Sequence, residues 1–151
     1  MPQQGDADSD AAPGEAIVRV SWIGTAAFGV TSALGAAVAA LDVVALVVAL
    51  AMFAAGTVAF FLAFAQAVAR SRTEQVGILS LFFLEGRVAP KPVRRLLLGS
   101  FLVEIAVAVA VAAVRPNTSL AFGILAPVYG LALAGLWGAR HGVFPERVQK
   151  R

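Results

Sequence analysis

The sequence contains no cysteine, only one histidine and few charged residues. The absence of cysteine excludes disulfide bonds, thiol redox chemistry and cysteine-ligated metals. Charged residues make up 14% of the 151 residues and hydrophobic residues 60%, whereas soluble proteins carry about 25% charged residues. A soluble domain of this size exposes much of its chain and needs more polar surface than this. The composition therefore indicates a membrane protein.

The usual motifs of enzymes are also missing. There is no glycine-rich phosphate loop, no G-x-S-x-G motif and no pair of neighbouring carboxylates inside the apolar segments. The single histidine, His141, has no suitably spaced partners for a metal site, so a solvated flank is the favoured interpretation. The net charge is +3, but the basic residues lie between apolar runs. We therefore expect no enzyme activity, no cofactor and no nucleic-acid partner.

Long apolar runs predict four membrane-spanning helices, since a span needs about 20 mostly apolar residues. Residues 20–69 contain a single charged residue, Asp42, which divides them into two spans and is a suitable N-cap for the second. Pro127 falls within the last run, where neighbouring helices can satisfy the freed backbone groups. The predicted fold is an all-α, polytopic four-helix membrane domain over residues 16–139. Its spans are 20–41, 43–68, 96–114 and 120–137.

The basic residues predict the orientation of these spans. If the N-terminus is cytoplasmic, eleven of the twelve basic residues lie inside, and only Arg115 lies outside. Such a bias towards the cytoplasmic loops sets membrane topology. We expect a disordered acidic tail over residues 1–15 and a basic cytoplasmic tail over residues 140–151. Both termini are then cytoplasmic.

The segment between spans two and three is apolar over residues 76–84, which is too short to cross a membrane. We predict an interfacial or partly re-entrant helix under the bundle, anchored by Phe82 and Phe83. The alternative is a surface that binds a partner.

Glu104 is the most informative residue, because it stands alone in an apolar span. Counted from the cytoplasmic end of its span, it lies roughly 12–16 Å deep, near the middle of a ~30 Å hydrocarbon core. Other polar side chains are expected at or near that level: Thr31, Ser32, Thr57, Ser100 and Tyr129.

Two interpretations of this polar layer remain open. Intramembrane acids often mark proton or solute sites, with Tyr129, Thr57 and Thr31 then serving as hydrogen-bond partners of Glu104. Alternatively, Glu104 is a neutral acid that joins helices, since no basic residue within the spans compensates its charge and burial favours the uncharged form.

Small residues recur at four-residue spacing in two of the spans. They are Ala27, Thr31, Gly35 and Ala39 in the first, and Gly130, Ala134 and Gly138 in the fourth. Such stripes allow helices to approach closely, either within the bundle or in a homo-oligomer. Packing within the chain is the favoured interpretation.

Two blocks of the C-terminal half, LFFLEGRVAPKPVRRLLLGSFLVE and LAFGILAPVYGLALAGLWGARHGVFPER, carry a family resemblance. The pattern resembles an uncharacterised family of small actinobacterial integral membrane proteins. This resemblance implies a bacterial plasma-membrane location and no particular activity.

The sequence thus favours a non-enzymatic accessory or scaffold subunit that contacts the lipid bilayer and a membrane-protein partner or a second copy of itself. The alternative is a small proton-coupled transporter or flippase-like protein that uses Glu104.

Overall fold

The computed structural model describes residues 13–147, and this part of the chain is all-α. Four of its helical segments are long and apolar enough to cross a membrane, so the protein is a multi-pass membrane protein. Two of them begin with a short 3-10 helix, named η1 and η2. In chain order the elements are α1 (Glu15–Ala37), η1 (Ala39–Leu41), α2 (Asp42–Arg70), α3 (Ile78–Phe82), α4 (Lys91–Val114), η2 (Ser119–Leu125) and α5 (Pro127–His141).

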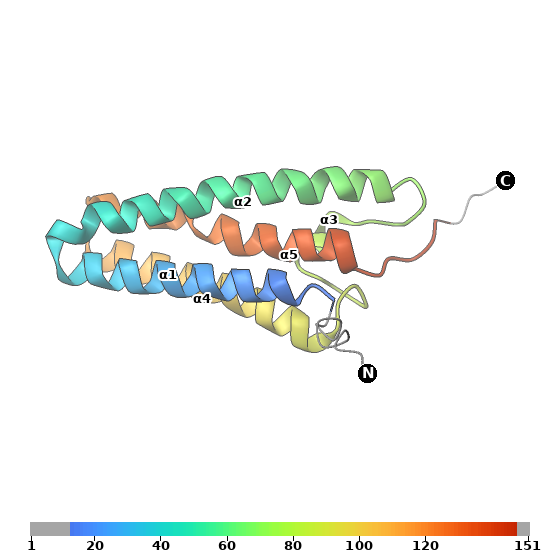
Figure 1. The fold of residues 1–151 in the computed structure, drawn as a ribbon, viewed down its shortest axis with the longest axis horizontal. Helices are drawn as coiled ribbons and strands as arrows, with labels where there is room; N and C mark the ends of the chain where they lie inside the picture. Colours follow the sequence, from blue (N-terminus) through green and yellow to red (C-terminus); the bar gives the residue numbers. More distant parts are fainter. Residues whose placement is uncertain (1–12, 148–151) are drawn as a thin grey trace, which may run out of the picture.

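The last helix, α5, is the centre of the fold (Figure 1). Helix α2 lies along one side of α5, and α1 and α4 lie along the other, while α3 packs near its C-terminal end. Most residues of α5 are buried, in contrast to the other helices, which turn many large apolar side chains outwards. The outward faces of α1, α2 and α4 are therefore the lipid-facing surface.

Small residues let α2 approach α5 closely. The buried face of α2 consists almost entirely of small side chains: Ala45, Ala49, Met52, Gly56, Ala59, Ala63 and Ala67. At Gly56, a Cβ atom would lie 2.7 Å from the Cα atom of Tyr129. The predicted stripe of the fourth span is also buried inside the bundle, as the packing interpretation requires, whereas the stripe of the first span is only partly buried. The longer stripe of small residues on α2 was not predicted from the sequence.

The first two spans form a tight hairpin. Asp42, predicted to be the N-cap of the second span, does not occupy that position. Leu41 occupies the N-cap position, and Asp42 is the first residue of α2. No side-chain capping bond forms, and Asp42 Oδ1 is buried without a hydrogen-bond partner in the described part of the chain. A carboxylate in the first turn still interacts favourably with the helix dipole, which explains an acid here without a cap.

Helix α3 packs beside the bundle and not under it. Leu81 and Phe82 are buried against α5, where the Leu81 carbonyl oxygen would lie 2.6 Å from a Cβ atom at Gly138. The Phe82 ring stacks on Phe60 of α2 with ring centroids 4.9 Å apart. Phe83, predicted to be a second anchor, is more than a third exposed.

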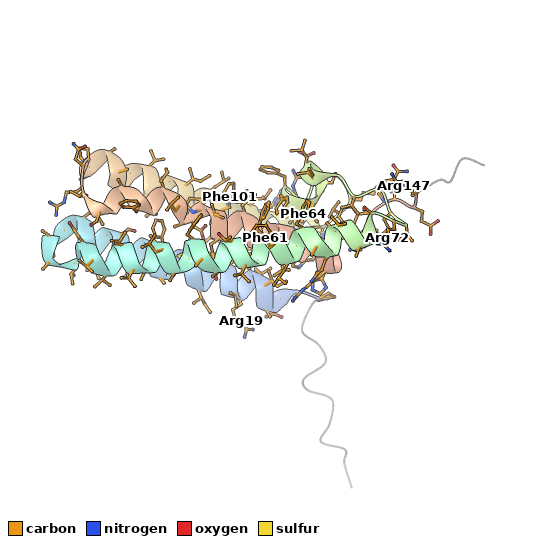
Figure 2. All side chains as sticks on the ribbon, turned by 90° about the horizontal axis from the view of Figure 1, so that it is seen from above. Arg19, Phe61, Phe64, Arg72, Phe101 and Arg147 are labelled. Carbon is orange, nitrogen blue, oxygen red and sulfur yellow. The ribbon has the colours of Figure 1, made fainter. Side chains whose placement is uncertain are left out.

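The charged end of the bundle contains every basic residue of the described chain except Arg115 (Figures 1 and 2). Here Arg70, the last residue of α2, donates hydrogen bonds to the carbonyl oxygens of Ala139 and Gly142, both at 2.9 Å. It also forms an ion pair with Glu74 and lies 5.1 Å from the centre of the Phe144 ring. One side chain thus connects the ends of α2 and α5.

The predicted spans and the helices differ at their ends, and α1 ends at Ala37, four residues before the predicted end of the first span. Helix α1 begins five residues before the predicted position and α4 begins at Lys91, so charged first turns extend past the apolar runs. The predicted C-terminal tail is in part ordered: Arg140 and His141 belong to α5. The following segment pairs with two loops, through Val143 N–H to Val88 O and Arg147 N–H to Thr73 O. Residues 1–12 and 148–151 of the two predicted tails lie outside the described residues.

Candidate functional site

The carboxyl group of Glu104 is the centre of a buried polar cluster. Its side chain is fully buried on α4. One oxygen, Oε1, is hydrogen-bonded to the Thr25 hydroxyl of α1 at 2.8 Å, and the other, Oε2, accepts from the Gly130 N–H of α5 at 3.1 Å. A single acid therefore joins three helices.

The Gly130 N–H is available because the fourth span changes its helical form there. The 3-10 helix η2 ends at Leu125, and α5 begins at Pro127. The Ala126 oxygen, which would accept from Gly130 in a continuous α-helix, accepts from Tyr129 N–H at 2.9 Å. The first N–H groups of any helix lack partners inside the helix, and the positive end of its dipole favours a carboxyl oxygen. Glu104 thus caps α5 inside the bundle.

Glycine at position 130 is required by this close approach. A Cβ atom there would lie 2.6 Å from Glu104 Oε2 and 3.0 Å from the Cα atom of Phe101. Any larger residue would push the Glu104 carboxyl group away from the backbone N–H of residue 130.

A second polar contact lies one helical turn nearer the charged end. The hydroxyls of Ser21 on α1 and Ser100 on α4 are 2.5 Å apart and fully buried. The pairs Ser21–Ser100 and Thr25–Glu104 are separated by one turn along both helices, which run parallel. These four residues, here called the α1–α4 polar row, are four of the five buried polar side chains of the described residues, the fifth being Ser32 of α1.

The structure brings together only part of the predicted polar layer. Ser100 belongs to the polar row, but the hydroxyls of Thr31 and Thr57 hydrogen-bond to carbonyl oxygens of their own helices, at Ala27, Phe28 and Phe53. Ser32 is buried without a hydrogen bond to Glu104. The proposed partnership of Thr31 and Thr57 with Glu104 is therefore wrong.

Tyr129 is close to the cluster but its hydroxyl is not part of it. The ring lies against Gly24, and the hydroxyl donates to the carbonyl oxygen of Val20 at 2.9 Å. The expected bond between Tyr129 and Glu104 is thus replaced by a bond to the α1 backbone. Both contacts hold α1 against the start of α5.

The described residues do not form a metal site. Residues 13–147 contain no group of three or more His, Asp or Glu side chains placed to hold a metal ion. His141 lies 5.6 Å from Trp137, measured between ring centroids, at the charged end of α5. The chain was compared with models of known protein families, with curated proteins and with solved structures, and none of the three comparisons found a match.

Proposed function

We propose that the chain is a non-enzymatic accessory or scaffold subunit of a bacterial plasma membrane, with both termini in the cytoplasm. The observation that carries the proposal is the closed environment of Glu104. Both carboxyl oxygens are hydrogen-bonded to groups of the same chain and the side chain is fully buried. An acid used in this way joins helices, and both of its oxygens are bonded to groups inside the bundle.

The geometry around Thr25 supports a neutral, structural acid. The Thr25 hydroxyl has one proton but lies within hydrogen-bond distance of two oxygens, Ser21 O at 3.0 Å and Glu104 Oε1 at 2.8 Å. If Glu104 is protonated on Oε1, it donates to Thr25, and Thr25 donates to Ser21 O. Gly130 N–H then donates to Oε2, and every group is satisfied. If Glu104 were ionised, Glu104 Oε1 and the Ser21 carbonyl oxygen would compete for the single hydroxyl proton of Thr25.

A partner-binding surface is suggested by the outer side of α3. Ile78 and Leu79 are 71% and 62% exposed, beside an apolar groove of about 250 Å³ between α2 and α3. Phe60, Phe64 and Phe82 line this groove, and Phe61 and Phe64 project from α2 on the same side of the molecule (Figure 2). A transmembrane helix of a partner protein could pack against the large apolar side chains of this groove. The buried face of α2, in contrast, carries mainly small side chains.

Affinity purification in mild detergent tests this proposal. We expect the wild-type chain to recover a stoichiometric membrane-protein partner, and the variant I78A/L79A to recover much less of it. The matched control is V109A, which truncates an exposed valine on α4, away from α3, and should leave recovery unchanged. If the chain purifies without any other protein, as a monomer or a homo-oligomer, this result would count against the accessory role.

The cytoplasmic placement of the charged end is supported by its basic residues. Lysine and arginine are concentrated in the loops that stay inside during membrane insertion, and only Arg115 is found at the opposite end of the described bundle. The plasma membrane itself is suggested by the resemblance to small actinobacterial membrane proteins.

A second candidate function, proton-coupled transport, is favoured by the α1–α4 polar row. The hydroxyls of Ser21 and Ser100 lie one turn nearer the charged end than Thr25 and Glu104, so a proton could reach the acid from that side if these side chains reorient. Proton flux into vesicles is the measurement. Flux that is present in the wild type and abolished in E104Q would support transport, whereas flux that survives E104Q would exclude this role for Glu104.

A further inference from the structure

A pocket at the charged end combines basic residues with apolar walls. It has a volume of about 570 Å³, within the usual range of small-molecule sites. Its walls come from the α3–α4 loop, the first turn of α4, the end of α5 and the segments at both ends of the described chain. We call it the α4–α5 pocket.

The charged residues that line the α4–α5 pocket are all basic. Arg87 and Lys91 line it together with His141, and no acidic side chain of residues 13–147 does. The two polar pockets near α2 each combine Arg147 with at least one glutamate. Neither Arg87 nor Lys91 forms an ion pair within residues 13–147. Their charges are therefore not neutralised by the described part of the chain.

The remaining wall is apolar. Val88, Ala89, Val93 and Val143 line the pocket with the ring of Trp137. The Trp137 Nε1 atom is buried with no acceptor among the described residues, and buried donors are normally satisfied. Lys91 is also the first residue of α4, where the helix dipole attracts anions. Positive charge at the rim and apolar walls below are complementary to one class of ligand, an anion with a hydrocarbon chain.

We propose that the α4–α5 pocket binds an anionic phospholipid, with the phosphate beside Arg87 and Lys91 and the upper acyl carbons against the valines. The position agrees with this ligand, because the pocket lies where α4 begins and α5 ends, at the level of the membrane surface. Basic pockets between transmembrane helices on the cytoplasmic side are known to take anionic headgroups. The bound lipid would belong to the same leaflet as the charged end.

The chain itself offers a local reporter. It has two tryptophans, and Trp22 is on α1, outside the pocket lining. In W22F the fluorescence comes from Trp137 alone. The full chain carrying W22F is reconstituted in phosphatidylcholine vesicles, and phosphatidylglycerol brominated near the top of its acyl chains is titrated in. We expect Trp137 to be quenched several-fold more strongly than by equally brominated phosphatidylcholine.

A charge-matched pair of variants separates this site from general attraction to a basic surface. R87Q/K91Q removes two positive charges from the pocket, and R94Q/R95Q removes two from the next turn of α4, outside the pocket lining. We expect the preference for phosphatidylglycerol to fall about thirty-fold in R87Q/K91Q, as for two lost contacts with an anionic lipid. It should change less than two-fold in R94Q/R95Q. Equal losses in both variants, or no loss in either, would overturn the proposal.

Two further arms identify the ligand. A89W, which fills the pocket without changing its charge, should reduce the preference for phosphatidylglycerol as strongly as R87Q/K91Q; an unchanged preference would place the lipid elsewhere. Glycerol phosphate, which has the headgroup chemistry without acyl chains, should not compete at millimolar concentration. Effective competition would show a site for a soluble phosphate compound and would contradict the lipid assignment.

Discussion

The guanidinium group of Arg70 donates to the carbonyl oxygen of Ala139 at 2.9 Å, and this contact links the end of α2 to the end of α5. The last carbonyl groups of a helix have no partners within it, and a basic side chain there also interacts favourably with the helix dipole. Because Arg70 further contacts Gly142 and Phe144, it holds the segment that follows α5 against the bundle.

Replacing Arg70 should therefore release that segment. In R70Q we expect the amides of Val143 and Arg147, which donate to the loops on either side of α3, to exchange with deuterium at least ten-fold faster. Each lost charge-assisted bond is worth about 1.5–3 kcal/mol when buried and less at this half-exposed position. Mass spectrometry of the chain in nanodiscs measures the exchange. The control R72Q changes an exposed arginine two residues later and should leave these rates unaltered.

Adding one methyl group between α2 and α5 should destabilise the bundle. In G56A the new Cβ atom meets the backbone of Tyr129 at 2.7 Å, so the two helices must separate. Overpacking of this kind typically costs about 1–3 kcal/mol, which thermal unfolding in detergent would detect as a lower midpoint. The same substitution at Gly29, where no atom lies within 4 Å of the new Cβ, should not lower it. An unchanged midpoint in G56A would show that this approach is looser than described.

Removing the Glu104 carboxyl should also lower stability. E104A leaves the Thr25 hydroxyl and the Gly130 N–H without their partner, and we expect a loss of roughly 2–4 kcal/mol, from unpaired polar groups and a cavity. T25V should cost less, about 1 kcal/mol, because it removes one of the two bonds. T31V is the matched control, since the Thr31 hydroxyl bonds only within α1. If T31V is as damaging as T25V, the hydrogen bond to Glu104 contributes nothing specific.

The absence of cysteine makes the predicted orientation easy to measure. Single cysteines at the exposed positions Glu85 and Pro116 lie in loops at opposite ends of the bundle. On intact cells, a membrane-impermeant maleimide should label P116C, whereas E85C should react only after the membrane is opened. The reverse pattern would place the charged end outside.

The number of spans and the tight first hairpin could be predicted from the sequence, and the structure confirms them. Apolar runs of about 20 residues allow few alternatives in a membrane. The ends of the helices were less predictable, because apolar runs do not mark them. Helix α4 extends through Arg94 and Arg95 to Lys91, where long basic side chains can reach the headgroup region.

The partners of Glu104 were mispredicted for an identifiable reason. Spans one and three both begin at the charged end, so residues at equal depth are found by counting from that end. Counting in this way places Glu104 level with Phe28, three residues from both Thr25 and Thr31, so depth alone does not distinguish the two threonines. Comparing span midpoints selected Thr31. Apart from Pro127, no feature of the sequence predicted that the Gly130 N–H would bind Glu104. This backbone donor becomes available only because the helix changes from η2 to α5.

The central position of α5 has a consequence for biogenesis. The ribosome completes α1, α2 and α4 before α5, yet α2 buries its small-residue face mainly on α5, and Glu104 of α4 caps its first turn. Until α5 is inserted, the alanines of α2 face lipid or the insertion machinery, and Glu104 lacks its backbone donor. Helix α1 can pack on α2 and α4 before then, but we expect the interior of the bundle to be complete only after α5 is inserted.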